Sequence, residues 1–130
     1  MKSVLLDTSA YIQFAAGDQR VADVIEDAPA TCLSTVVLGE LLVGYAPGTR
    51  WEAGRTVLDD FLLTVGVRVW AVDSGTAHQY ASLYNLLKRQ GQMIPVNDLW
   101  IAATPLEHDL MVLTADGHFT GLPIDCLLLD

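Results

Sequence analysis

Short apolar runs alternate along this chain with longer segments in which apolar residues recur every three or four positions. The runs, typical of buried strands, first end at Leu6 and then occupy residues 31–34, 67–72, 111–114 and 124–129. The longer segments, typical of helices with one buried face, span residues 8–16, 18–28, 36–45, 50–64, 74–90 and 98–108. Apolar strands that alternate with helices form parallel sheets covered on both faces, so the pattern predicts an α/β fold.

Residues with short polar side chains precede several of the expected helices, where such side chains can cap the first turn. These residues are Thr8 and Ser9, Thr35, Asp73 and Ser74, and Asn97. Pro105 conflicts with its surroundings, because a proline inside a helix removes one backbone hydrogen bond. We expect a kink there.

The segment from Val36 to Tyr45 is apolar on nearly every side except at Glu40. A helix without a polar face is usually covered all round. We expect such cover here, with a partner chain as one possible source of it.

The composition fits one compact domain that spans residues 1–130, because 52% of the residues are hydrophobic and 18% are charged. No apolar run approaches the length of about 20 residues that a membrane span needs, and the first residues do not resemble a secretion signal. We therefore expect a cytoplasmic protein that does not contact a membrane. Cys32 and Cys126 lie in apolar runs and are expected to be interior residues rather than a disulfide or metal ligands.

The formal net charge of −9 argues against a protein that coats nucleic acid, which would be basic along one face. It does not exclude a nuclease, because bound divalent metal reverses the local potential of clustered carboxylates. Surplus acid also keeps a hydrophobic domain soluble, and this accounts for much of the charge.

Four of the sixteen acids stand out by their context: Asp7, Glu40, Asp98 and Asp116. Asp7 and Asp116 follow buried strands, Glu40 interrupts an apolar helix, and Asp98 opens a helix. Each has a simpler explanation, since carboxylates also cap turns and complement helix dipoles. Glu40 fits that explanation least, because a charge surrounded by apolar residues needs a partner or a metal.

Together these acids predict a metal site. The carboxyl ends of parallel strands meet at one edge of a sheet, where ligand chemistry collects. Four carboxylates crowded there cannot all stay ionised without a cation. Hard oxygen ligands favour Mg²⁺ or Mn²⁺, and one or two such ions suit the hydrolysis of phosphodiesters.

Four blocks of the sequence, in this order, resemble the PIN domain and, within that family, VapC-type toxins of toxin–antitoxin pairs. The blocks are residues 5–9 (LLDTS), 34–41 (STVVLGEL), 97–103 (NDLWIAA) and 113–119 (LTADGHF). The resemblance implies a three-layer α/β/α sandwich around a parallel sheet of four to five strands. It also implies an endoribonuclease that depends on Mg²⁺ or Mn²⁺.

By matching motif, the four acids take the catalytic and metal-binding positions of the family, with Asp7 and Asp98 as the usual direct ligands. Four polar residues then fall where they can orient these carboxylates. They are Thr8, Ser9, Asn97 and Thr114.

The resemblance also implies partners: an RNA substrate, a second copy of the chain, and an antitoxin whose tail fills a hydrophobic groove and reaches the acids. The helix from Val36 and the one with Trp51, Val57 and Phe61 are candidates for the groove, although core packing explains each residue equally well.

The basic residues are few, so we expect a small RNA footprint, with Arg50 and Arg55 as candidate contacts. His118 is a third candidate because it lies in the loop after Asp116. His78 and His108 are expected at the surface.

Two other functions remain open. A phosphatase with Asp7 as the nucleophile is less favoured, because Ser9 stands where the haloacid-dehalogenase pattern requires a second Asp. A binding module that has kept the fold but lost catalysis would bind no metal ion.

Overall fold

The computed structural model describes residues 1–64 and 66–129 and contains one sheet of five parallel strands. The strands are β1 (Val4–Leu6), β2 (Thr31–Ser34), β3 (Val67–Trp70), β4 (Met111–Thr114) and β5 (Cys126–Leu128). Their order across the sheet is β3-β2-β1-β4-β5, which places β1 in the middle. This confirms the α/β prediction, including the parallel sheet.

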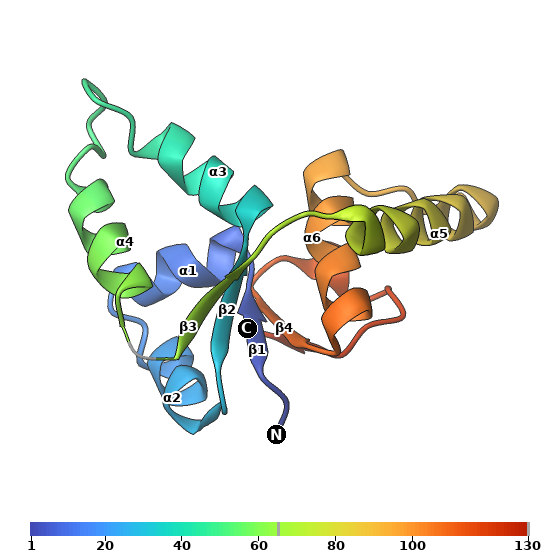
Figure 1. The fold of residues 1–130 in the computed structure, drawn as a ribbon, viewed down its shortest axis with the longest axis horizontal. Helices are drawn as coiled ribbons and strands as arrows, with labels where there is room; N and C mark the ends of the chain where they lie inside the picture. Colours follow the sequence, from blue (N-terminus) through green and yellow to red (C-terminus); the bar gives the residue numbers. More distant parts are fainter. Residues whose placement is uncertain (65, 130) are drawn as a thin grey trace.

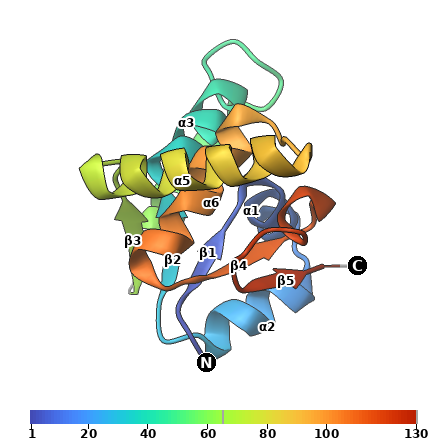
Figure 2. The ribbon, with the colours of Figure 1, turned by 90° about the vertical axis from the view of Figure 1, so that its right-hand side faces the viewer.

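Helices cover both faces of this sheet. They are α1 (Thr8–Ala15), α2 (Gln19–Asp27), α3 (Thr35–Gly44), α4 (Gly54–Leu62), α5 (Ser74–Gln90) and α6 (Val96–His108), with a short 3₁₀ turn, η1 (Gly117–Phe119). Figure 1 shows α1, α2 and α4 on one side of the strands and α5 and α6 on the other. Figure 2, turned by 90°, shows α5 and α6 lying together across the strands.

The centre of the sheet forms the core. Val4, Leu5 and Leu6 are fully buried, as are Val112 and Leu113 of the neighbouring strand β4. Leu6 lies opposite Leu113, so Asp7, just beyond the end of β1, comes next to Thr114, the last residue of β4. The register of the two central strands therefore sets the position of the first predicted acid.

Several predicted boundaries differ from the structure because other groups supply the caps. Asp7 caps α1 and Ser34 caps α3, in place of Ser9 and Thr35. The α4 helix begins only at Gly54, since Glu52 accepts a hydrogen bond from the backbone of Gly48 and closes a loop ahead of the helix.

Two expected strands are shorter than predicted. β3 ends at Trp70, because the backbone N–H of Val72 binds the hydroxyl of Thr35 rather than a neighbouring strand. The last strand covers Cys126–Leu128 instead of residues 124–129. Cys32 is buried as expected, but Cys126 lies on this edge strand and is only partly buried.

Asn97 does not cap α6, contrary to the prediction. The helix begins at Val96, two residues before the predicted start at Asp98, with Pro95 before it and no side-chain cap. Asn97 is exposed within the first turn. The helix continues through Pro105, which is buried, as far as His108.

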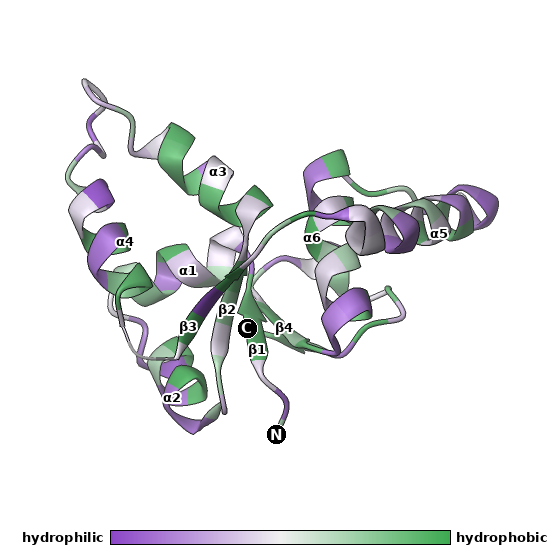
Figure 3. Ribbon diagram, viewed as in Figure 1, coloured by the Kyte–Doolittle hydropathy of each residue, from purple (hydrophilic) through white to green (hydrophobic). Residues whose placement is uncertain are grey.

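His108 is not the surface residue that we expected. Its ring stacks on Trp70 with 3.7 Å between centroids, and its side chain is 18% exposed. Conversely, α3 is not covered on every side within this chain, since Val43 is 77% exposed. Figure 3 shows α3 as mainly hydrophobic along its length.

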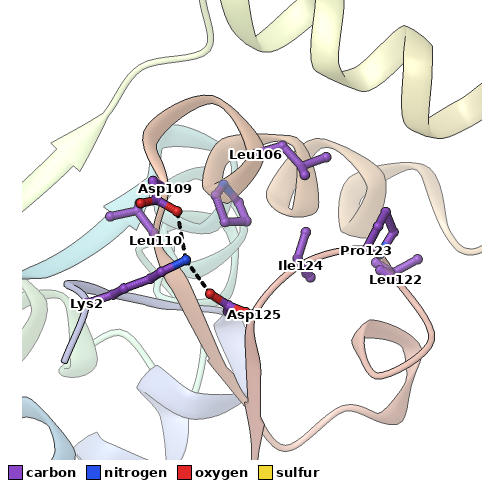
Figure 4. A pocket seen from close by; sticks show the side chains of 9 residues that line it. Lys2, Leu106, Asp109, Leu110, Leu122, Pro123, Ile124 and Asp125 are labelled. Carbon is purple, nitrogen blue, oxygen red and sulfur yellow. Dashed lines mark hydrogen bonds and ion pairs between the residues drawn. The ribbon is translucent and has the colours of Figure 1, made fainter.

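At the amino ends of the strands, Lys2 joins the segment before β1 to the segments before β4 and β5. Its ammonium group binds the carboxylates of Asp109, at 2.7 Å, and Asp125. These contacts border a cavity of about 370 Å³ whose lining also includes the apolar side chains of Leu106 and Leu122, as Figure 4 shows. The cavity lies at the edge opposite to Asp7.

None of the helices among the described residues is both long and apolar enough to cross a bilayer.

Phe61 belongs to the core rather than to an exposed groove. It is 7% exposed, and its ring lies 5.3 Å from those of Tyr11 and Phe14. We predict that Phe61→Ala lowers the free energy of unfolding by about 3–5 kcal/mol, because it removes a buried aromatic ring. Val57→Ala, on the exposed face of the same helix, should cost less than about 1 kcal/mol. Urea denaturation measures both, and similar losses in the two variants would contradict this assignment.

Candidate active site

Asp7 lies at the carboxyl end of the central strand and begins α1. It is only 3% exposed. Its Oδ1 accepts a hydrogen bond from the backbone N–H of Ala10 at 2.8 Å, and the Ser9 hydroxyl donates to the same oxygen at 2.7 Å. The hydroxyl of Thr114 donates to Oδ2. A buried carboxylate needs such donors, and Asp7 has three.

The two hydroxyl groups that donate to Asp7 also accept hydrogen bonds from the segment after β4. Ser9 Oγ accepts the N–H of Ala115 at 3.0 Å, and Thr114 Oγ1 accepts the N–H of Asp116 at 2.8 Å. This network joins the start of α1 to the loop that carries Asp116.

Asp98 is in the first turn of α6, with its side chain 18% exposed. Burial is the largest cause that raises the pKa of this carboxyl. A hydrogen bond with His118 opposes the rise, while the charges of Asp116 and Glu40 add to it. Asp98 therefore lies within electrostatic reach of both of these acids.

Asp116 caps the 3₁₀ turn η1 and lies beside both other aspartates. Its Oδ1 accepts the backbone N–H of His118 at 2.9 Å. Its charge also raises the pKa of Asp7, although burial of Asp7 is the larger cause and the three hydrogen bonds oppose it. The position of Asp116 thus depends on the turn that follows it.

Glu40 reaches this edge from α3. The hydroxyl of Thr8, the first residue of α1, donates to Glu40 Oε1 at 2.8 Å. Glu40 is partly buried, and this bond fixes its carboxylate next to the helix that Asp7 caps. All four predicted acids therefore lie at one edge of the sheet.

Three of the predicted orienting residues contact these acids. Ser9 and Thr114 bind Asp7, and Thr8 binds Glu40. Within residues 1–64 and 66–129, the side chain of Asn97 makes no hydrogen bond that would place it in this role.

The oxygen donors of this edge fit a divalent metal such as Mg²⁺ or Mn²⁺. One ligand atom from each of Asp98, Asp116 and His118 lies within 4.8 Å of the others. The sequence pattern marked the two acids but not the direction of the His118 ring, which turns towards them. The sequence named His118 from its place in the loop after Asp116, but as an RNA contact and not as a neighbour of Asp98.

Of the two arginines predicted to contact RNA, Arg55 belongs to α4 and Arg50 lies in the loop before this helix. The Arg50 guanidinium is 4.6 Å from the centre of the Trp51 ring. Arg55 pairs with Asp59 at 3.2 Å, and both side chains are about half exposed. RNA contact by either arginine stays a prediction.

A groove of about 530 Å³ leads away from Glu40. Its walls are mainly apolar and come from α1, α3 and the start of α4. They are formed by Thr8, Ile12, Ala15, Ala16, Glu40, Leu41, Gly44, Tyr45, Arg50, Trp51, Ala53, Gly54 and Val57. Thr8 and Glu40 belong to both the groove and the acidic edge, so the two features are continuous.

A model of the PIN domain family matches residues 4–124 of this chain. The chain belongs to the PIN domain family. Two Mycobacterium tuberculosis relatives place it among the VapC-type members. Ribonuclease VapC5 is 32% identical over 118 residues, which are 91% of this chain and 86% of that protein. Ribonuclease VapC4 is 31% identical over 91 residues, 70% of each chain.

Solved structures of VapBC complexes share the fold. VapBC2 from Rickettsia felis, bound to a DNA fragment from its promoter, matches with a TM-score of 0.85 and 21% identity over 98% of this chain and 99% of that chain. VapBC-5 from M. tuberculosis matches with a TM-score of 0.77 and 28% identity over 98% of both chains. The PIN fold of this chain is thus close to that of toxins solved in complexes.

The acidic edge predicts how the stability of the metal-free PIN domain varies with pH. The pKa values of Asp7 and Asp98 are raised above 3.8, so the folded protein keeps protons that the unfolded chain releases. The free energy of unfolding should therefore fall as the pH rises from about 4 through these raised values. Asp7→Asn and Asp98→Asn should each make this fall smaller.

Thermal unfolding between pH 4 and pH 7, in the presence of a chelator, measures this dependence. Asp27→Asn is the matched control, because Asp27 is an exposed residue at the end of α2. Slopes in the two site variants that equal those of the wild type and the control would contradict the prediction.

Proposed function

We propose that this chain is a metal-dependent endoribonuclease and the toxin of a type II toxin–antitoxin system. One observation supports this above all: Asp7, Glu40, Asp98 and Asp116 lie at one edge of the sheet in a member of the PIN family. Two relatives are named ribonucleases, and the solved neighbours include VapBC toxin–antitoxin complexes.

The residues fit Mg²⁺ or Mn²⁺ as the cofactor. Asp7 and Asp98 have raised pKa values, so their ionised forms are costly without a compensating cation. A bound divalent ion would activate water for attack on phosphorus and would stabilise the charge that develops on the phosphate oxygens.

The chain's own groups hold and orient the site. Asp7 and Asp98 would be the principal ligands, with Glu40 and Asp116 completing or bracing the set. Three donor groups hold the Asp7 carboxylate, and one of them, the Ser9 hydroxyl, lies within hydrogen-bond distance of both of its oxygens. Thr8 holds the Glu40 carboxylate in the same way.

The substrate would be RNA, cut to leave a 5′-phosphate and a 3′-hydroxyl. Arg50 and Glu40 both line the groove, and the arginine is suited to bind a phosphate of the RNA near the cleaved bond. The net charge of −9 favours a small contact area rather than a long one.

The role of Ser9 argues against the phosphatase alternative. That alternative needs a second acid at this position, whereas the Ser9 hydroxyl donates to Asp7 and accepts the backbone N–H of Ala115. The alternative of a non-catalytic module predicts that the site binds no metal ion.

Catalysis by these acids can be tested by amide substitution. We predict that Asp7→Asn and Asp98→Asn each lower RNA cleavage at least a hundredfold, an order of magnitude typical of losing one main electrostatic group, and also abolish growth arrest. Cleavage of total RNA with Mn²⁺, followed by mapping of new 5′ ends, measures the effect. Asp27→Asn should cleave normally. Wild-type activity in either site variant, with the fold intact by circular dichroism, would exclude this mechanism.

The groove supports an antitoxin as the partner. Its apolar walls suit a hydrophobic segment, and Glu40 at its end brings such a segment to the active site. The exposed apolar surface of α3, with Val43 at 77% exposure, suits either the antitoxin or a second copy in a homodimer. Both partners, and a cytoplasmic location, are part of this proposal.

Two glycines of α3 allow a matched test of the groove. A Cβ atom at Gly44 or Gly39 would meet nothing within 4 Å, but only Gly44 lines the groove. We predict that Gly44→Trp fills the groove and weakens binding of the cognate antitoxin at least tenfold, whereas Gly39→Trp does not. Isothermal titration of the separately refolded antitoxin measures both. Unchanged binding in Gly44→Trp would place the antitoxin elsewhere.

A further inference from the structure

His118 is held in place on both sides along the chain. Before it, the Asp116 carboxylate accepts its backbone N–H at 2.9 Å and caps the 3₁₀ turn. After it, Phe119 is fully buried. The ring of His118 therefore extends from an anchored turn rather than from a free loop.

The ring nitrogen of His118 faces the acids. Its Nδ1 lies 3.1 Å from Asp98 Oδ2 and 3.2 Å from Asp116 Oδ1. The side chain is 51% exposed, so the contact with the two acids does not result from burial of the ring. Asp98 is fixed by α6 and Asp116 by η1, and His118 bridges the two elements.

These three ligand atoms are close enough to share one metal ion. They lie within 4.8 Å of one another. Ligands about 2.1 Å from a common ion lie about 3 to 4 Å apart, so small side-chain rotations would bring them into position. Neither Asp7 nor Glu40 belongs to this group of three.

We propose that His118 is a metal ligand, and that its nitrogen makes the site select Mn²⁺ over Mg²⁺. This inference rests on the proposed metal-dependent function and assigns to His118 a role other than RNA contact. Mg²⁺ prefers oxygen ligands and keeps its water, whereas Mn²⁺ and later transition metals accept imidazole more readily. A site in which an imidazole joins the carboxylates therefore discriminates between these ions.

Binding of Mn²⁺ to the purified protein, without RNA, tests the proposal. The Mn²⁺ signal in electron paramagnetic resonance should show coupling to a directly bound ¹⁴N nucleus, and this coupling should disappear in His118→Asn. The affinity of the same variant should fall about tenfold for Mn²⁺ and less than about threefold for Mg²⁺. A tenfold loss is the smallest expected when a group around a metal is removed. His78→Asn, at an exposed position on α5, should match the wild type.

Asp98→Asn separates failure of this inference from failure of the proposed function. Suppose that the wild type binds Mn²⁺ without ¹⁴N coupling and that Asp98→Asn loses this binding. In that case His118 is not a ligand, and the carboxylate site stands. Equal losses of Mn²⁺ and Mg²⁺ affinity in His118→Asn would likewise overturn the selectivity. If the wild type binds neither ion, both proposals fall.

Discussion

The burial of one carboxylate, that of Asp7, is the constraint on which the active-site edge depends. A charge this far from water is tolerated only where donors surround it. Ser9, Thr114 and the backbone of Ala10 supply them. The two hydroxyls in turn accept backbone N–H groups of residues 115 and 116. Satisfying Asp7 therefore ties the first helix to the end of β4 and positions Asp116.

Three of the four acids also stabilise the ends of helical segments. Asp7 caps α1, Asp98 lies in the first turn of α6, and Asp116 caps η1. The positive end of a helix dipole offsets part of the cost of a negative charge. Capping and metal binding are thus compatible roles, and for these three acids the simpler explanation is true without excluding the functional one.

The acidic edge and the apolar groove form one continuous surface because α1 contributes to both. Thr8 binds Glu40 at the first turn of α1, and Ile12, one turn later, lines the groove. A partner segment bound in the groove would therefore lie beside the proposed metal ligands. This arrangement fits the proposal that an antitoxin silences the nuclease.

The sequence by itself determined the kinds of elements and the parallel sheet, and it marked the four acids as candidates, because apolar periodicity and strand-end carboxylates are local signals. It named Asp73 among the candidate caps of α5, but it did not identify the caps of α3 and α6, where Ser34 and Pro95 stand in the positions expected for Thr35 and Asn97. Which of several neighbouring residues becomes the cap depends on the backbone path by which the chain enters the helix.

Only the tertiary structure decided the contacts between residues distant in the chain. The bond from Thr8 to Glu40, the stacking of His108 on Trp70 and the turn of His118 towards Asp98 all join separate elements. Such contacts arise when the register of the sheet and the packing of helices bring side chains together. No local pattern encodes these contacts. For the same reason, the burial of Phe61 and the exposure of Val43 became evident only in the folded chain.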